Sequence, residues 1–228
     1  MDLSLSDIPG RSSIVLYLWG CNFFCPYCHN KICLDPIAKR EIEIPNLVSK
    51  ILENRLSNAL SVTGGEPLLQ TDSLLQLIRL LREKRQDYYI SIDTNGSFPE
   101  NVKKVAPLVN RIAIDFKHEP GQYEKAVNRP IDPKKILESI SIANETERLD
   151  IEVRTVLARP LVSFETIETI ISHLKEISFR GTYVISQYIP SEGVDPQYKS
   201  QFFTEPNANV EEFINRLKNL PFKVKMRN

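Results

Sequence analysis

The stretch IVLYLWGCNFFCPYCHN, residues 14–30, decides the fold of this chain. It begins with the apolar and aromatic run Ile14–Trp19, whose length and composition are typical of a buried β-strand. Gly20 then permits a tight turn, and three cysteines follow in C-x3-C-x2-C spacing. In parallel α/β folds, binding sites lie at the carboxyl ends of the strands. The stretch therefore predicts a strand that leads directly into a ligand-binding loop.

Similar runs recur along the chain and alternate with segments whose apolar residues have helical spacing. The predicted strands are Ile14–Trp19, Ala59–Thr63, Tyr88–Asp93, Arg111–Asp115, Leu149–Val156 and Thr182–Tyr188. The helical stripes begin at Leu47, Leu74, Val102, Ile136, Ile167 and Val210. Pro99 and Pro133 suit a first helical position, and Ser163 suits an N-cap.

Repeated strand–helix alternation predicts a parallel sheet with helices outside it. Six units are too few for a closed eight-stranded barrel, so we expect an α/β fold of the partial (β/α)6 TIM-like barrel type. No low-complexity linker interrupts the pattern. We expect one domain over residues 1–228, with its core at about 14–190 and a C-terminal helix and short strand within 207–226.

Composition narrows the class of protein. Apolar residues make up 42% and charged residues 25%, which is ordinary for a soluble globular chain. Acidic and basic residues balance at 29 each, so charge gives no argument for nucleic acid or an anionic membrane as a partner. No signal peptide or long apolar span is evident, and we expect a cytoplasmic protein. In a reducing cytosol, the four cysteines between positions 21 and 33 are better metal ligands than disulfide partners.

Chemistry-bearing residues also follow the later strands. Thr63-Gly64-Gly65-Glu66-Pro67 ends the second predicted strand, Asp93-Thr94-Asn95-Gly96 the third, and Asp115-Phe116-Lys117 the fourth. Each motif alone would equally suit a turn with a solvated charge. Two facing carboxylates, however, would repel each other unless a cation or Lys117 lay between them. Arg154 on the fifth strand suits either a strand edge or a carboxylate ligand, and Gln187 ends the sixth.

Three thiolates on one short loop can hold three irons of a cubane cluster and leave the fourth iron open. Three other interpretations compete with this one. A structural zinc site would need Cys33 or His29 as a fourth ligand. Cys25–His29 also matches the attachment pattern of c-type haem, and Cys33 could complete a four-cysteine electron-transfer cluster. We favour a structural role for both Cys33 and His29.

The cysteine loop, Gly-Gly-Glu-Pro, Asp-Thr-Asn-Gly-Ser, Asp-Phe-Lys, Val-Arg-Thr and Ser-Gln-Tyr occur in an order that resembles the radical S-adenosylmethionine (SAM) superfamily. The resemblance implies a [4Fe–4S] cluster on Cys21, Cys25 and Cys28 whose open iron binds SAM. It also implies reductive cleavage of SAM to methionine and a 5′-deoxyadenosyl radical. The implied cofactor-binding residues are Tyr27, Gly64, Gly65, Glu66, Asp93, Thr94, Asn95, Asp115, Lys117, Arg154 and Gln187.

Within that set, the resemblance gives Glu66 to the amino group of SAM and Lys117 to its carboxylate. It makes Asp93 and Asp115 the frame of a monovalent cation site, Arg154 a contact of the cofactor or ribose, and Gln187 a contact of the adenosyl group or substrate. The strand-two motif begins with Thr63 where serine is commoner in the superfamily, and strand six reads Ile-Ser-Gln-Tyr.

The branch it resembles most is that of the anaerobic ribonucleoside-triphosphate reductase activating proteins, relatives of pyruvate formate-lyase activating enzyme. This implies installation of a glycyl radical on a partner such as anaerobic ribonucleotide reductase, with flavodoxin or ferredoxin as electron donor. The basic run Arg79, Arg82, Lys84 and Arg85 could dock such a donor, although a solvated helix end is the commoner use. The enzyme alternative is a small-molecule member such as 7-carboxy-7-deazaguanine synthase, and the non-enzyme alternative is an iron–sulfur or zinc module.

Overall fold

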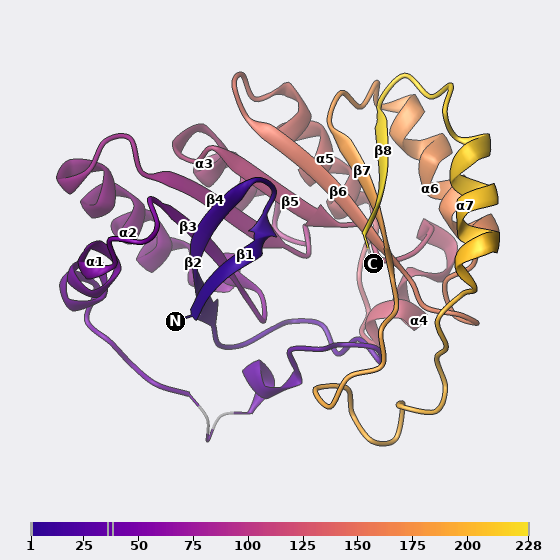
Figure 1. The fold of residues 1–228 in the computed structure, drawn as a ribbon, viewed down its shortest axis with the longest axis horizontal. Helices are drawn as coiled ribbons and strands as arrows, with labels where there is room; N and C mark the ends of the chain where they lie inside the picture. Colours follow the sequence, from indigo (N-terminus) through magenta and orange to yellow (C-terminus); the bar gives the residue numbers. More distant parts are fainter. Residues whose placement is uncertain (1, 36, 38, 228) are drawn as a thin grey trace.

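A computed structural model describes residues 2–35, 37 and 39–227, and within them one curled sheet carries helices along its outer face (Figure 1). Its eight strands are β1 (Asp2–Ile8), β2 (Arg11–Leu18), β3 (Ala59–Gly64), β4 (Tyr89–Thr94), β5 (Arg111–Asp115), β6 (Asp150–Leu157), β7 (Thr182–Gln187) and β8 (Lys223–Arg227). The strands lie side by side in chain order; β1 pairs antiparallel with β2, and every later pair is parallel. The predicted α/β fold, a partial parallel barrel, is confirmed.

The helices occupy the connections between the parallel strands. They are α1 (Ile44–Glu53), α2 (Thr71–Lys84), α3 (Pro99–Val105), α4 (Tyr123–Val127), α5 (Lys134–Glu145), α6 (Phe164–Glu176) and α7 (Asn207–Arg216), with the 3-10 turns η1 (Lys31–Leu34), η2 (Pro67–Gln70), η3 (Ala106–Leu108) and η4 (Pro120–Gln122). Pro99 opens α3, and Ser163 caps α6 through a capping box with Thr166, both as predicted. Pro133 lies one position earlier than predicted, at the N-cap of α5.

The N-terminal strand β1 was not predicted from the sequence. Its alternating pattern lacks a buried face, because Leu3 and Leu5 are exposed and only Ile8 is fully buried. The signal that could have found it is the Pro9-Gly10 pair, since Gly10 adopts a φ of 74° in the turn to β2. β1 is therefore a hairpin arm added to the edge of the parallel sheet.

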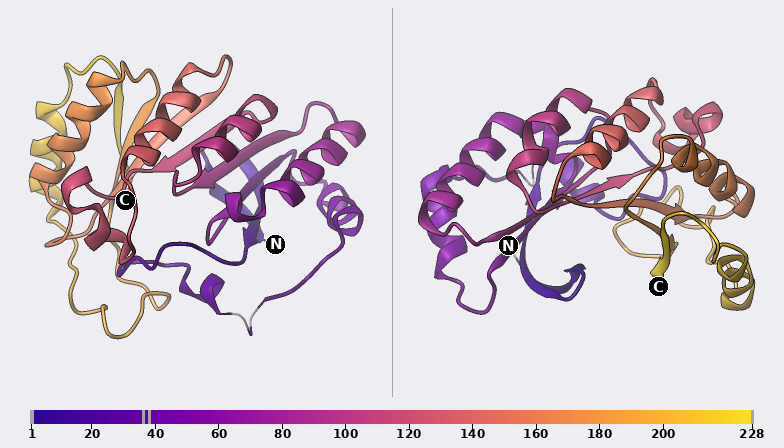
Figure 2. Two further views of the ribbon diagram at one scale, coloured as in Figure 1. Left: turned by 180° about the vertical axis from the view of Figure 1, so that it is seen from behind. Right: turned by 90° about the horizontal axis from the view of Figure 1, so that it is seen from above.

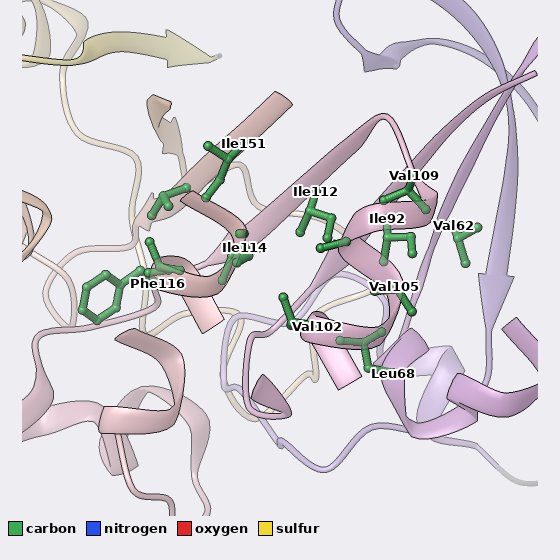
Figure 3. Packing of buried hydrophobic residues seen from close by; sticks show 14 of the residues in the cluster. Val62, Leu68, Ile92, Val102, Val105, Val109, Ile112, Ile114, Phe116 and Ile151 are labelled. Atoms are coloured by element: carbon green, nitrogen blue, oxygen red, sulfur yellow. The ribbon is translucent and has the colours of Figure 1, made fainter. Parts of the chain in front are cut away.

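The convex face of the sheet is apolar. Alternate residues of the central strands, including Ile92, Ile112 and Ile114, point outward and are fully buried. Figure 3 shows these side chains beside Val102 and Val105 of α3, and Figure 2 shows the helices ranged along this outer face. Burial of this face against the helices forms the main core, and burial of each such side chain stabilises the fold by about 1.5–3 kcal/mol.

The concave face is polar because the strands are in register. One row across it pairs Asp93, Ala113, Glu152, Thr182 and Lys223, and the next pairs Asp115, Arg154, Val184 and Lys225. Residues paired in register point to the same face of a sheet. The register therefore gathers the charged residues of distant segments inside the half-barrel.

Candidate active site

One cavity lies where the parallel strands end. Its volume of about 340 Å³ is typical of small-molecule sites. Twelve of the predicted site residues line it: Cys21, Cys25, Cys28, Tyr27, Gly64, Gly65, Asp93, Thr94, Asn95, Asp115, Lys117 and Arg154. They come from the loops and ends of β2, β3, β4, β5 and β6. Glu66 and Gln187 are the two predicted residues that the structure does not place on its wall.

Backbone hydrogen bonds hold the start of the cysteine loop against the end of β3. The amide of Gly65 donates to the carbonyl of Leu18 at 2.9 Å, and the amide of Glu66 donates to the carbonyl of Gly20 at 2.7 Å. A Cβ at Gly65 would overlap the Gly20 carbonyl oxygen, and Gly64 has a φ of +120°. The two glycines are therefore required by a close approach of backbone to backbone.

The three loop thiols differ from the fourth cysteine in their surroundings. Burial raises the pKa of Cys21 to about 11 and that of Cys25 to about 12, so both are protonated thiols until a metal displaces the proton. Cys33 is 1% exposed in η1 and does not line the cavity. The cavity thus holds three thiols, with the His29 side chain also on its wall, and three thiolates fit a cluster with one open iron.

Glu66 lies behind the cavity wall. Its carboxylate accepts hydrogen bonds from the Leu68 amide at 2.9 Å, the Thr94 hydroxyl at 2.7 Å and the Asn95 amide at 2.6 Å. Burial raises its pKa to about 7, although these donors oppose that shift. The carboxylate ties the end of β3 to the end of β4, and its contact with an ammonium group stays a prediction.

Asp93 and Asp115 line the cavity, and the guanidinium of Arg154 lies between their carboxylates. Arg154 donates to Asp93 at 2.9 Å through Nη1 and to Asp115 at 3.1 Å through Nε. Lys117 donates to Asp115 at 2.9 Å. The Arg154 guanidinium therefore bridges the two carboxylates, and a monovalent cation beside them stays a prediction.

These charges shift one another. Burial raises the pKa of Asp115, but Lys117 and Arg154 outweigh it, so this pKa lies below its usual value. Burial lowers the pKa of Lys117, and the Asp115 carboxylate reverses this and raises it well above the usual range. Both side chains are therefore charged at neutral pH. Deeper in the half-barrel, Arg111 extends the network to Asp93 at 3.3 Å and to Glu152 at 2.9 Å.

Gln187 is buried away from the cavity. Its amide donates to the Glu205 carbonyl at 3.1 Å and to the Asn207 side chain at 2.9 Å, which anchors the start of α7. Gln187 ends β7 as predicted. Its contact with an adenosyl group or substrate stays a prediction.

Tyr27 lines the cavity, and its ring packs into a small apolar cluster with Tyr188, Val194 and Phe202. The ring lies edge-on against Phe202, with centroids 5.8 Å apart, and its buried hydroxyl has no hydrogen-bond partner among the described residues. Burial raises the pKa of this phenol well above its usual value. It is an orphaned polar group at the cavity wall, which is typical of a site that takes a polar ligand.

Ten further residues that line the cavity were not among the predicted site residues. They are Asp7, Tyr17, Phe23, His29, Asn30, Leu34, Thr63, Val156, Ser186 and Arg227, of which His29 had been given a structural role and Thr63 only opened a motif. Asn30 donates to the carbonyl of Gly64 at 3.3 Å, and Arg227 pairs with Glu152 at 3.2 Å. Arg227 comes from β8, which we expected only as an appendage of the core. Alternation with Lys223 and Lys225 was the available signal that these residues share one face.

The basic run at the end of α2 is partly committed within the chain. Arg82 donates to the carbonyls of Gln86 and Tyr88 and to the side chain of Asn110.

Among the described residues, no three His, Cys, Asp or Glu side chains converge closely enough to hold a single metal ion. No described helix is both long and apolar enough to cross a membrane.

Comparison with known proteins gives a consistent result. Residues 18–177 match the radical SAM superfamily. The chain is 32% identical over 206 residues to a "Putative glycyl-radical enzyme activating enzyme" of Methanocaldococcus jannaschii, covering 87% of this chain and 82% of that protein. It is 33% identical over 111 residues to a 7-carboxy-7-deazaguanine synthase of Methanothermobacter thermautotrophicus, covering 47% of this chain and 42% of the synthase. Its fold is similar to that of SuiB of Streptococcus suis, with a TM-score of 0.66 and 14% identity over 95% of this chain and 49% of SuiB, so it spans about half of that structure.

Proposed function

This chain belongs to the radical SAM superfamily, and on that premise we propose that it installs a glycyl radical on a partner enzyme. The family uses a [4Fe–4S] cluster and SAM. When bound and reduced by an external donor, the cluster would supply one electron to the sulfonium of SAM, whose S–C5′ bond would break to give methionine and a 5′-deoxyadenosyl radical; this radical would take a hydrogen atom from a glycine of the partner and leave as 5′-deoxyadenosine. Anaerobic ribonucleotide reductase is the partner we favour, with flavodoxin or ferredoxin as the electron donor.

The residues of the cavity divide the work of holding these groups. Cys21, Cys25 and Cys28 ligate three irons of the cluster. Gly64 lines the cavity, whereas the Glu66 carboxylate is engaged behind the wall, so the Gly64 carbonyl would accept from the amino group of SAM in addition to its hydrogen bond from Asn30. Lys117 is the cavity's ammonium and binds the carboxylate of SAM while Asp115 keeps it charged and in place.

The single observation that carries the proposal is that three thiols of one loop share a cavity with these groups while the fourth cysteine does not. A four-cysteine electron carrier needs a fourth thiolate there, and Cys33 is not on the wall. A zinc module could use His29, which lines the cavity, but it needs four donors that converge on one ion, and no three His, Cys, Asp or Glu side chains of the described residues do so. The choice of a glycyl-radical partner is supported by similarity to the activating enzyme over most of both chains.

A small-molecule substrate is the second candidate. It is favoured by the similarity to 7-carboxy-7-deazaguanine synthase, but that similarity covers less than half of either chain. The cavity wall formed by β7 and β8 lies outside the residues that match the superfamily, and this wall would distinguish the two substrates.

The experiment has two stages. The protein is reconstituted anaerobically with iron and sulfide, then reduced with dithionite in the presence of SAM, and 5′-deoxyadenosine is measured. We expect its formation; if none forms with a cluster present, the enzyme proposal is wrong. The reduced enzyme is then mixed with candidate partner enzymes and examined by electron paramagnetic resonance for a glycyl doublet. Cleavage of SAM without a doublet for any partner favours the small-molecule candidate.

A further inference from the structure

The edge strand β8 carries a row of cations along the inside of the half-barrel. Lys223, Lys225 and Arg227 alternate along the strand, and their partners in register, Thr182, Val184 and Ser186, lie on the concave face of β7. Residues that alternate in a strand point to the same side, and these three span about 13 Å. The row is therefore a straight basic track on one edge of the sheet.

The track leads from the amino-terminal end of the half-barrel to the cavity with the cysteines. Lys223 and Lys225 line a groove at the amino ends of the strands, whereas Arg227 lines the cavity itself. The other wall of the cavity's open side is formed by Asp7 of β1 and Tyr17 of β2. In the right-hand view of Figure 2, the indigo strand β1 and the yellow strand β8 lie on the side of the sheet opposite α2, α3 and α5.

The charge on this track is mostly uncompensated within the described chain. Arg227 shares Glu152 with Arg111, and neither Lys223 nor Lys225 pairs with a described carboxylate. Both lysines are exposed. The floor of the groove carries both signs, with Glu145, Glu147 and Asp150 against Arg148, Arg180 and Lys218, so the row on β8 is the part with one sign only.

The outer edge of β8 is also without a strand partner in the described residues, since β8 ends the sheet order. Such an edge presents backbone amides and carbonyls that another extended chain can pair with. Lysines protect an edge against a second copy of itself, because like charges repel. A segment of opposite charge meets no such repulsion.

We propose that the row Lys223–Lys225–Arg227 binds an extended acidic segment of the partner polypeptide along β8 and so delivers its reactive glycine to the cavity. This inference rests on the proposed function and names the chemistry of its partner. The bound segment has acidic side chains at alternate positions, which face the three cations, and its glycine lies beyond Arg227 at the cysteine loop. An anionic segment that follows β8 also replaces the counter-charge that the two lysines lack.

The probes are two synthetic twelve-residue peptides with a central glycine, one with glutamate and one with lysine at alternate flanking positions. Their binding to the reconstituted, SAM-loaded enzyme is measured by fluorescence anisotropy under anaerobic conditions. We expect the acidic peptide to bind at least about tenfold more tightly than the lysine peptide. Its affinity should fall as salt rises from about 50 to about 300 mM, because salt screens interactions between exposed charges.

The variant K223E/K225E should lose this preference and bind the lysine peptide more tightly instead. The matched control is K103E/K104E on α3, which makes the same change in net charge on the outer side of the molecule. It should bind both peptides like the wild type. Equal weakening in the two variants, or no preference in the wild type, would overturn the inference.

A single-stranded oligonucleotide of twelve thymidines separates another class of partner. If it binds more tightly than the acidic peptide through the same lysines, the track serves nucleic acid and the inference is wrong. Cleavage of SAM by dithionite-reduced enzyme is measured on the same samples. Its absence in the wild type contradicts the proposed function, whereas normal cleavage with no effect of K223E/K225E on peptide binding contradicts this inference alone.

Discussion

The two faces of the curled sheet come from the same strands and yet hold opposite kinds of side chain. On β4, Ile92 is fully buried among the helices, and the next residue, Asp93, is buried on the inner side between Arg111 and Arg154. Both residues are buried, so burial alone does not distinguish core from site. The two side chains differ in what they contact: Ile92 packs against apolar groups on the convex face, and Asp93 pairs with charged groups on the concave face. A half-barrel can therefore keep stability and chemistry on opposite sides of one backbone.

The largest effect should come from the loop that closes the concave face. Cys25→Ala should reduce SAM cleavage by more than about a thousandfold, because three thiolates are needed for the cluster. The matched control is Cys33→Ala, which should retain cleavage since Cys33 lies outside the cavity. Iron content and 5′-deoxyadenosine are the measurements. Loss of the cluster in Cys33→Ala would restore the four-cysteine carrier as an interpretation.

Ile92→Ala tests the convex face. It should lower the free energy of unfolding by roughly 2–5 kcal/mol through lost burial and a cavity. The affinity of the folded protein for SAM should change little, because Ile92 faces the helices. Denaturant titration and SAM binding by calorimetry measure the two quantities. If SAM affinity falls as much as stability, the two faces are not independent.

Glu66 lies at the boundary between the two faces and gives a pH dependence. Its carboxyl has a pKa of 4.5 when unfolded and about 7 when folded, so the folded state holds its proton more tightly. Its contribution to the free energy of unfolding is fully present below pH 4.5 and is lost as the pH rises through about 7. The total loss is about 3 kcal/mol. Denaturant titrations across this range should show the loss in the wild type. Glu66→Gln should lack it, and the exposed control Glu124→Gln should keep it.

Asp93→Asn tests the concave face at the neighbour of Ile92. Removal of its charge should lower the free energy of unfolding by about 2 kcal/mol. The loss is limited because Arg111 keeps Glu152 as a partner and Arg154 keeps Asp115. The affinity for SAM should also fall, in contrast to Ile92→Ala. The same titrations and calorimetry measure both. Unchanged SAM binding in Asp93→Asn would show that the network is only structural.

The smallest effect should come from Ser61→Ala on the inner face of β3. The Ser61 hydroxyl is buried and has no hydrogen-bond partner in the part of the chain that the structure describes. Its removal should change the free energy of unfolding by less than about 1 kcal/mol, and in the stabilising direction. A large loss of stability would mean that a buried water molecule completes this site.

Periodicity predicted the parallel strands because convex residues must alternate to face the helices. It missed β1, where Leu3 and Leu5 cover nothing, since an edge hairpin need not bury one face. Motif order predicted the cavity walls well because each motif follows a strand, and parallel strands end at one rim. Glu66 and Gln187 show the limit of this argument. Position at a strand end gives the rim but not the direction of the side chain, which depends on hydrogen bonds to Asn95 in one case and to Glu205 in the other.

Charge balance on the concave face shows a second limit. The repulsion between Asp93 and Asp115 predicted a cation between them, and the structure supplies Arg154 from a strand 39 positions beyond Asp115. Sequence spacing cannot show which of several cations reaches the gap, since the answer depends on register across three strands. Arg227 was missed for the same reason, because β8 joins the sheet only after α7.

The close contact between Gly20 and residues 65–66 also sets an order in time. The loop's thiols are shaped by groups made later: the Glu66 amide holds the Gly20 carbonyl, and the Asn95 side chain lies 3.9 Å from the sulfur of Cys21, 74 positions away. At about 5–20 residues per second, a ribosome reaches Asn95 roughly 4–15 s after Cys21. During those seconds the nascent chain carries three thiols without their scaffold. Iron and sulfide should therefore be delivered to this protein after β4 has been synthesised. Before that point the three thiols are most open to oxidation.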